Sequence, residues 1–210
     1  MTDRTPFSAL HFRGRMNAHI SHDLKNVTAT ISETAWLLQD LLDMMSAKKE
    51  MDGERLKVLI SRIIDETDRG NGLLKNLNTF AHSTDKKVKR VDLRETAELM
   101  AGLASCLPFA RMVEVDAGTE PVEVATRPYF IEQYCYHIFR ANFEAMKPER
   151  KMTIKVEASS NARGIALGPL ATQPDEQLTA ILDEIAAEIG GKSEIDAESK
   201  TAVLSIEPLG

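Results

Sequence analysis

The segment HISHDLKN, residues 19–26, places two histidines, an acid, a base and an amide within about two helical turns. An unprotonated imidazole is a nucleophile that can attack phosphorus. In a helix, Asp23 adjoins His22 and Asn26 lies one turn further on, so that a carboxylate and an amide can contact the same ring. These residue types at this spacing indicate group-transfer chemistry at His22. His19 is the competing histidine, but no acid follows it.

The helix that carries His22 must hold the imidazole away from the core. His22 is two residues from both Ile20 and Leu24, which is about 200° around a helix, so we expect it to face solvent. On helical phase alone, an exposed histidine is an ordinary polar surface residue. The apolar side of the helix follows alternating steps of four and three, as in a left-handed bundle: Ile20, Leu24, Val27, Ile31, Thr34, Leu38, Leu41 and Met45.

A second helical arm is expected after a turn at Asp52–Gly53. Extra apolar positions make the apolar stripe of each arm wider than one partner helix can cover. This excess predicts either a four-helix-bundle homodimer or docking of these faces onto the chain's own C-terminal half. The expected seam of the second arm is Leu56, Ile60, Ile63, Thr67, Gly70, Leu74, Leu77 and Ala81, and the extra positions are Leu42, Leu59, Ile64, Leu73 and Phe80.

The pattern changes after the polar and basic stretch 83–90, and an α+β sandwich is expected from there on. A helix is predicted over 92–107 with Asp92 and Glu95 as its capping box, and two further helices over 128–146 and 174–191. Strands are predicted over 111–117, 121–125, 151–159, 163–169 and 201–208. We therefore expect a helical hairpin domain at 1–84 and a sandwich domain at 85–210. Gly164 and Gly168 are interpreted as turn residues.

The composition argues against several classes of binding partner and binding site. The chain has 210 residues and a formal net charge of −6, so it has no overall basic field to attract nucleic acid or anionic lipid. No apolar run reaches the length of a signal segment or a membrane span, and a cytoplasmic location without membrane contact is expected. Cys106 and Cys135 lack the spacing of a metal site and are predicted to be reduced core residues.

The motif SHDLKN at 21–26 resembles the H-box of two-component histidine kinases, which reads S-H-(E/D)-(L/I)-(K/R)-(N/T)-P. The resemblance implies that His22 is the phosphoacceptor, that Asp23 is the acid beside it, and that Asn26 can position water for dephosphorylation. Val27 stands where the family has its usual proline. The resemblance also implies a dimeric four-helix bundle, built from the long N-terminal hairpin, followed by an ATPase-like α/β sandwich.

The sandwich looks degenerate as a nucleotide-binding domain. The stretch RPYFIEQYCYHIFRANFEAMKP at 127–148 resembles the helix of the family's N-box. His137 and Ala141 stand where that box has its two asparagines, and Asn142 is one residue off. Neither D-x-G-x-G nor G-x-G-x-G follows. Because phosphoryl transfer from ATP depends on positioning by such groups, no ATP cofactor and no metal of the chain's own are expected.

An H-box without a nucleotide site resembles the ChpT-like histidine phosphotransferases. This implies that His22 carries a phosphoryl group between the aspartates of response-regulator receiver domains, which supply the magnesium. A non-catalytic regulator of a response regulator is the alternative, and a divergent active kinase is a third. If the hairpin turns near residue 50, His22 lies opposite Thr79. The candidates for receiver contact are then four residues taken as exposed: Met16, Asn17, Lys25 and Phe80.

Overall fold

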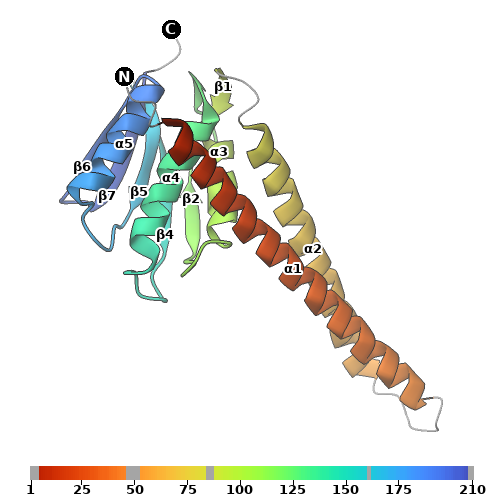
Figure 1. Cartoon of the computed structure of the whole chain (residues 1–210). Coiled ribbons are helices and arrows are strands. Elements are labelled where there is room, and N and C mark those ends of the chain that lie inside the picture. Colours follow the sequence, from red (N-terminus) through yellow and green to blue (C-terminus); the bar gives the residue numbers. More distant parts are fainter. Residues whose placement is uncertain (1–4, 46–52, 84–87, 160–161, 208–210) are drawn as a thin grey trace.

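The computed structural model describes residues 5–45, 53–83, 88–159 and 162–207. Two long helices, α1 (Thr5–Met45) and α2 (Gly53–His82), form an antiparallel hairpin that projects from the rest of the molecule (Figure 1). The predicted pair of helical arms is therefore present. The predicted turn residue Asp52 and the domain boundary after residue 84 lie outside the described residues.

The C-terminal half is an α+β sandwich, and the predicted fold class is confirmed. A five-stranded sheet has the strand order β2-β4-β5-β7-β6, in which only β2 and β4 run parallel, and β1 pairs with β3 in a separate two-stranded sheet. Helices α3, α4 and α5 cover one face of the larger sheet (Figure 1). The elements are β1 (Lys89–Asp92), α3 (Leu93–Ala104), β2 (Val113–Asp116), β3 (Glu123–Thr126), α4 (Pro128–Phe143), β4 (Met152–Ala158), β5 (Arg163–Gly168), α5 (Glu176–Glu188), β6 (Gly191–Asp196) and β7 (Thr201–Ile206).

Local sequence signals explain most of these boundaries. The Asp92 side chain accepts a hydrogen bond from the Arg94 amide and caps α3. Pro128 opens α4, and Asp175 caps α5 by accepting from the amide of Leu178. Short strand β6, which directly follows the turn at Gly190, is an element that the strand pattern did not predict.

The interpretation of Gly164 and Gly168 as turn residues is wrong, because both lie in strand β5. A Cβ atom at Gly164 would collide with the backbone carbonyl of Leu204 on the neighbouring strand β7. At Gly168 it would collide with the side chain of Thr201. The glycines are therefore needed for close approach of backbones within the sheet.

The base of the hairpin shares one hydrophobic core with the sandwich. The Phe12 ring of α1 lies 5.4 Å from the ring of Phe80 on α2, and 5.6 and 4.8 Å from the rings of Tyr129 and Tyr136 on α4. Met16 is fully buried in the same cluster. The expectation that Met16 and Phe80 are exposed is wrong, because the sandwich covers this end of the hairpin.

The register of the hairpin also differs from the predicted one. Asp23 forms an ion pair with Arg69, and a Cβ atom at Gly70 would lie 3.1 Å from the Val27 side chain. Val27 is therefore level with Gly70, where the predicted register would place Leu74 opposite it, so His22 is not level with Thr79. The buried face of α2 is rotated from the predicted seam: it consists of Leu59, Gly70, Leu73 and Phe80, whereas Ile60 and Leu74 are exposed.

Phe80 gives a first test of this shared core. Replacing Phe80 with alanine removes an aromatic side chain that is 1% exposed and packs against Phe12. The expected loss is roughly 3–5 kcal/mol in the free energy of unfolding, measured by chemical denaturation. Val88→Ala, at a position 62% exposed, is the control and should cost less than about 1 kcal/mol. Equal losses for the two variants would contradict burial of Phe80.

Candidate functional site

The structure brings His22, Asp23 and Asn26 together on the solvent side of α1. The His22 side chain is 73% exposed, and its Nδ1 atom lies 3.4 Å from Oδ1 of Asp23. Nδ2 of Asn26 lies 3.3 Å from the same Nδ1 atom. Among the described residues, no hydrogen bond reaches Nε2, which leaves the other ring nitrogen open to a partner.

The two neighbours of Nδ1 suit different protonation states of the imidazole. When Nδ1 carries a proton, it can donate to the Asp23 carboxylate, and Nε2 then holds the free lone pair. When Nδ1 is unprotonated, it can accept from the amide of Asn26. The carboxylate favours the first tautomer, in which the exposed nitrogen is the nucleophile.

Asp23 is itself held in place from two other elements. Its side chain is only 17% exposed, and Oδ2 lies 3.7 Å from the guanidinium of Arg69 on α2. The thiol of Cys106, two residues after α3, lies close enough to the same carboxylate for Asp23 to raise its pKa. Burial is the main cause of this raised pKa, which is about 11, so the thiol is protonated at neutral pH.

Arg69 and Cys106 are contacts of the site that the sequence did not predict. Each lies more than forty residues from Asp23 in the chain, and the incorrect register placed Thr79 opposite His22. Both cysteines are free and buried, as expected from the sequence.

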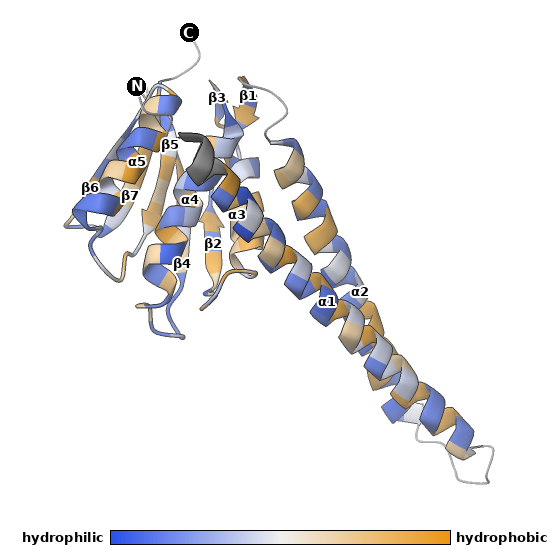
Figure 2. Ribbon diagram, viewed as in Figure 1, coloured by the Kyte–Doolittle hydropathy of each residue, from blue (hydrophilic) through white to orange (hydrophobic). Residues whose placement is uncertain are grey.

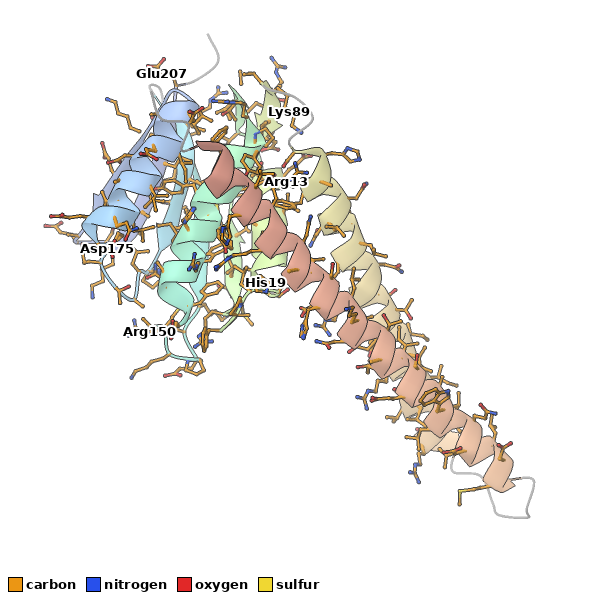
Figure 3. All side chains as sticks on the ribbon, viewed as in Figure 1. Arg13, His19, Lys89, Arg150, Asp175 and Glu207 are labelled. Atoms are coloured by element: carbon orange, nitrogen blue, oxygen red, sulfur yellow. The ribbon has the colours of Figure 1, made fainter. Side chains whose placement is uncertain are left out.

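The other predicted site residues are more dispersed. Asn17 and Lys25 are exposed on α1, whereas Met16 and Phe80 are buried and unavailable to a partner. His19 is half-buried on the part of α1 that runs beside the sandwich (Figure 3). Burial and the nearby charge of Arg15 lower its pKa. His19 is thus less accessible than His22.

In α4, the helix that resembles the N-box, the asparagine side chain binds the loop that follows β5. Asn142 is fully buried, its Nδ2 donates to the Ile138 carbonyl at 2.9 Å, and its Oδ1 accepts from the amides of Ala171 and Thr172 at 2.8 and 3.3 Å. Both ends of the amide are occupied by protein groups. Burial and Arg140 lower the pKa of His137, one turn before Ala141, to about 4, so this imidazole is neutral at neutral pH.

No family model and no curated protein matches the sequence. Solved structures do match. The Acinetobacter baumannii histidine kinase AdeS matches with a TM-score of 0.44 and 15% identity, covering 84% of this chain and 96% of that chain. A bacterial phosphotransferase matches with a TM-score of 0.47 and 12% identity over 92% of this chain and 94% of that one. The ATP-binding domain of PrrB from Mycobacterium tuberculosis matches with a TM-score of 0.46 and 14% identity, covering 60% of this chain and 99% of that chain.

Within the described residues, no helix combines the length and apolar character that a bilayer crossing requires.

Proposed function

We propose that the chain is a histidine phosphotransferase, which carries a phosphoryl group on His22 between the aspartates of receiver domains and does not use ATP. The observation that carries the proposal is the exposed imidazole whose Nδ1 faces a carboxylate and whose Nε2 faces solvent. A nucleophile that exchanges a group with other proteins must be reachable by them, and His22 is.

The transfer is a reversible displacement at phosphorus. The Nε2 lone pair of His22 attacks the phosphorus of an aspartyl phosphate, an N–P bond forms, and the P–O bond to the receiver aspartate breaks to release its carboxylate. The imidazole keeps its Nδ1 proton and becomes cationic, and the Asp23 carboxylate stabilises that charge. Attack by a second receiver aspartate on the phosphorus reverses these steps. Arg69 positions Asp23 for this role.

Two features favour an aspartyl phosphate over ATP as the phosphoryl donor. The only asparagine near the N-box position, Asn142, is engaged at both ends of its amide. The chain also lacks the glycine motifs that hold a triphosphate. The donor's magnesium and acidic pocket would then belong to the receiver.

The test is to incubate the protein separately with radiolabelled phospho-receivers and with labelled ATP. Acid-labile label on the protein from a receiver supports the proposal. Label from ATP alone would establish a kinase instead, and label from neither would leave a regulator that binds without carrying phosphate.

We also propose that the hairpin pairs with a second copy in a four-helix bundle. Large apolar side chains remain exposed along its outer part, where the sandwich does not reach: Trp36, Leu37, Leu42, Met44, Val58, Ile60 and Ile64. Figure 2 shows apolar residues continuing along the hairpin beyond the sandwich. Exposed apolar side chains on both helices fit an isologous partner of identical sequence.

Ile64 gives a direct test of the homodimer. Ile64→Glu should weaken dimerisation on the order of 100-fold, because a carboxylate would be buried without a partner in the interface. Sedimentation equilibrium measures the dissociation constant. Arg62→Glu, which changes an exposed charge in the same turn, is the matched control. A wild-type protein that stays monomeric, or an unchanged constant for the isoleucine variant, would exclude this interface.

A further inference from the structure

A surface groove lies between α1 and α4, on the side of α1 that carries His22. It is lined by His11, Phe12 and Arg15 of α1 and by Tyr136, His137 and Arg140 of α4. We call it the α1–α4 groove. Phe12 and Tyr136 are buried and form an aromatic floor, whereas Arg15 and Arg140 are exposed at its edges. All the charged residues of this lining are basic.

The two arginines of the α1–α4 groove have no acidic partner within the described part of the chain. No ion pair or hydrogen bond links Arg15 or Arg140 to a carboxylate there, although the chain as a whole is acidic. Their charges act on the neighbouring histidines: besides burial, Arg140 lowers the pKa of His137 and Arg15 lowers that of His19. An adjoining hollow, which shares His137 and Arg140, is lined by the acid Asp175, whose carboxylate already caps α5.

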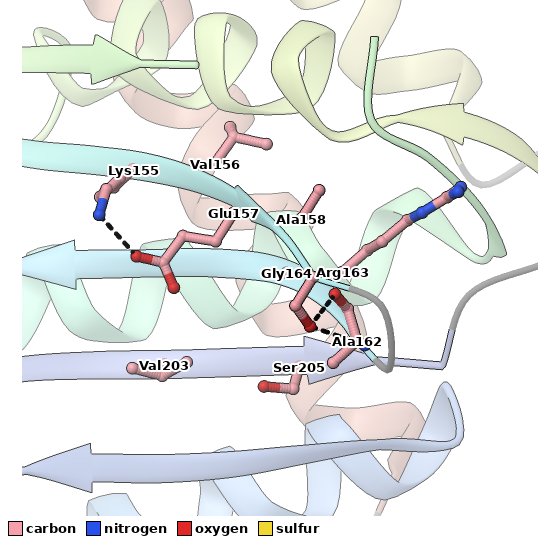
Figure 4. Close-up of a pocket in the computed structure, with 10 residues that line it drawn as sticks. Lys155, Val156, Glu157, Ala158, Ala162, Arg163, Gly164, Val203 and Ser205 are labelled. Carbon is pink, nitrogen blue, oxygen red and sulfur yellow. Dashed lines mark hydrogen bonds and ion pairs between the residues drawn. The ribbon is translucent and has the colours of Figure 1, made fainter. Parts of the chain in front are cut away.

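In a second hollow, by contrast, the charged side chains bind to groups of the chain itself. It lies on the face of the sheet turned away from the helices, beside β4, β5 and β7 (Figure 4). There Lys155 pairs with Glu157 at 2.9 Å, and Arg163 donates to the carbonyl of Glu123. The α1–α4 groove differs because its positive charges are left for an external anion.

The α1–α4 groove lies within reach of a protein that is docked on His22. His11, Arg15 and His19 follow one another at four-residue steps, so they lie on one face of α1 that leads to His22. Arg15 is seven residues from His22, which is about 10 Å along the helix axis. A typical interface covers about 800 Å² per partner, equivalent to a radius of about 16 Å around its centre.

We infer that the α1–α4 groove is a docking site for an acidic surface segment of the receiver domain that exchanges a phosphoryl group with His22. The inference rests on the proposed function for the identity of the partner. The two arginines attract the acidic segment and fix its orientation, and the aromatic floor contacts its apolar atoms. Because the rest of the chain is acidic, this local positive field directs the receiver to the His22 side of the hairpin.

The experiment measures receiver binding and phosphoryl transfer separately. The purified receiver domains of the organism that encodes the chain are titrated against the full chain, and the one that binds most tightly is used. The double variant Arg15→Glu/Arg140→Glu should weaken its binding at least about tenfold at low salt and reduce the salt dependence. Lys192→Glu, an exposed reversal on β6, is the matched control and should leave binding unchanged. Circular dichroism verifies that both variants are folded.

The outcomes separate the docking site from the proposed function. Weakened binding in the double variant but not in the Lys192 variant supports the α1–α4 groove, whether or not His22 becomes labelled. Unchanged binding in the double variant overturns it, even if transfer to His22 is normal. If the groove is required but His22 takes no label, the proposed function fails and the docking site stands. Absence of binding by every receiver overturns the docking site.

Discussion

Replacing His22 with alanine is expected to reduce phosphoryl transfer from a phospho-receiver by at least about 1,000-fold. The substitution removes the only nitrogen in the site that is both exposed and oriented by a carboxylate, so no acceptor is left for the group. Single-turnover transfer of radiolabel, followed by acid treatment to identify the phosphoramidate, measures the effect. Because His22 is 73% exposed, the fold should be unchanged.

Two matched variants separate the role of His22 from general damage to the helix. His19→Ala removes the other histidine of the segment and should retain most of the transfer, because His19 is half-buried and has no adjacent acid. Asp23→Asn should slow transfer by about 10- to 100-fold, since the amide can no longer stabilise a cationic ring. Label that persists in the His22 variant and disappears in the His19 variant would move the phosphoacceptor to His19.

The contacts within the predicted site depend on short-range spacing, which explains why sequence was sufficient for them. Residues one and four apart in a helix necessarily meet, so the grouping of His22, Asp23 and Asn26 follows once α1 is recognised as a helix. The cap at Asp92 and the start of α4 at Pro128 are equally local. The order of strands and helices then determines the α+β class.

The sequence did not predict the contacts that depend on how two helices, or the hairpin and the sandwich, pack against each other. An amphipathic stripe gives the phase of α2 only to within one residue, and an error of that size exchanges buried Leu73 for exposed Leu74. Placing Thr79 opposite His22 depends on a separate assumption, a turn near residue 50, and the structure instead brings Arg69 to Asp23. Met16 and Phe80 look like surface residues only when the sandwich is left out, because it is the sandwich that buries them.

Glu132 is a further residue that periodicity could not identify, because it is a carboxylate in the core. It lies on α4 and is 1% exposed, and it accepts a hydrogen bond of 2.8 Å from the hydroxyl of Ser83, the residue that follows α2. Burial raises the pKa of this carboxyl to about 8, although the Ser83 hydrogen bond and the charges of Lys89 and Arg13 oppose the shift. Glu132 thus joins the end of the hairpin to the sandwich in its protonated form.

The raised pKa makes stability depend on pH in a defined direction. Below about pH 4.5 the carboxyl is protonated in both the folded and the unfolded chain, so its contribution to the free energy of unfolding is fully present. Between this value and about 8, the unfolded chain releases the proton and the folded chain keeps it. The free energy of unfolding therefore falls as the pH rises, by about 1.4 kcal/mol per pH unit from this group alone.

Glu132→Gln should remove this contribution while keeping an acceptor for the Ser83 hydroxyl. We expect the free energy of unfolding of the variant, relative to wild type, to rise by roughly 4 kcal/mol between pH 5 and pH 8. Denaturant titrations at a series of pH values measure the difference, and subtracting wild type cancels the titration of all other groups. Glu144→Gln, at an exposed position just after α4, should show no such trend. A difference that stays constant with pH would mean that Glu132 is already ionised in the folded protein, and that the junction between hairpin and sandwich is held by a charged group.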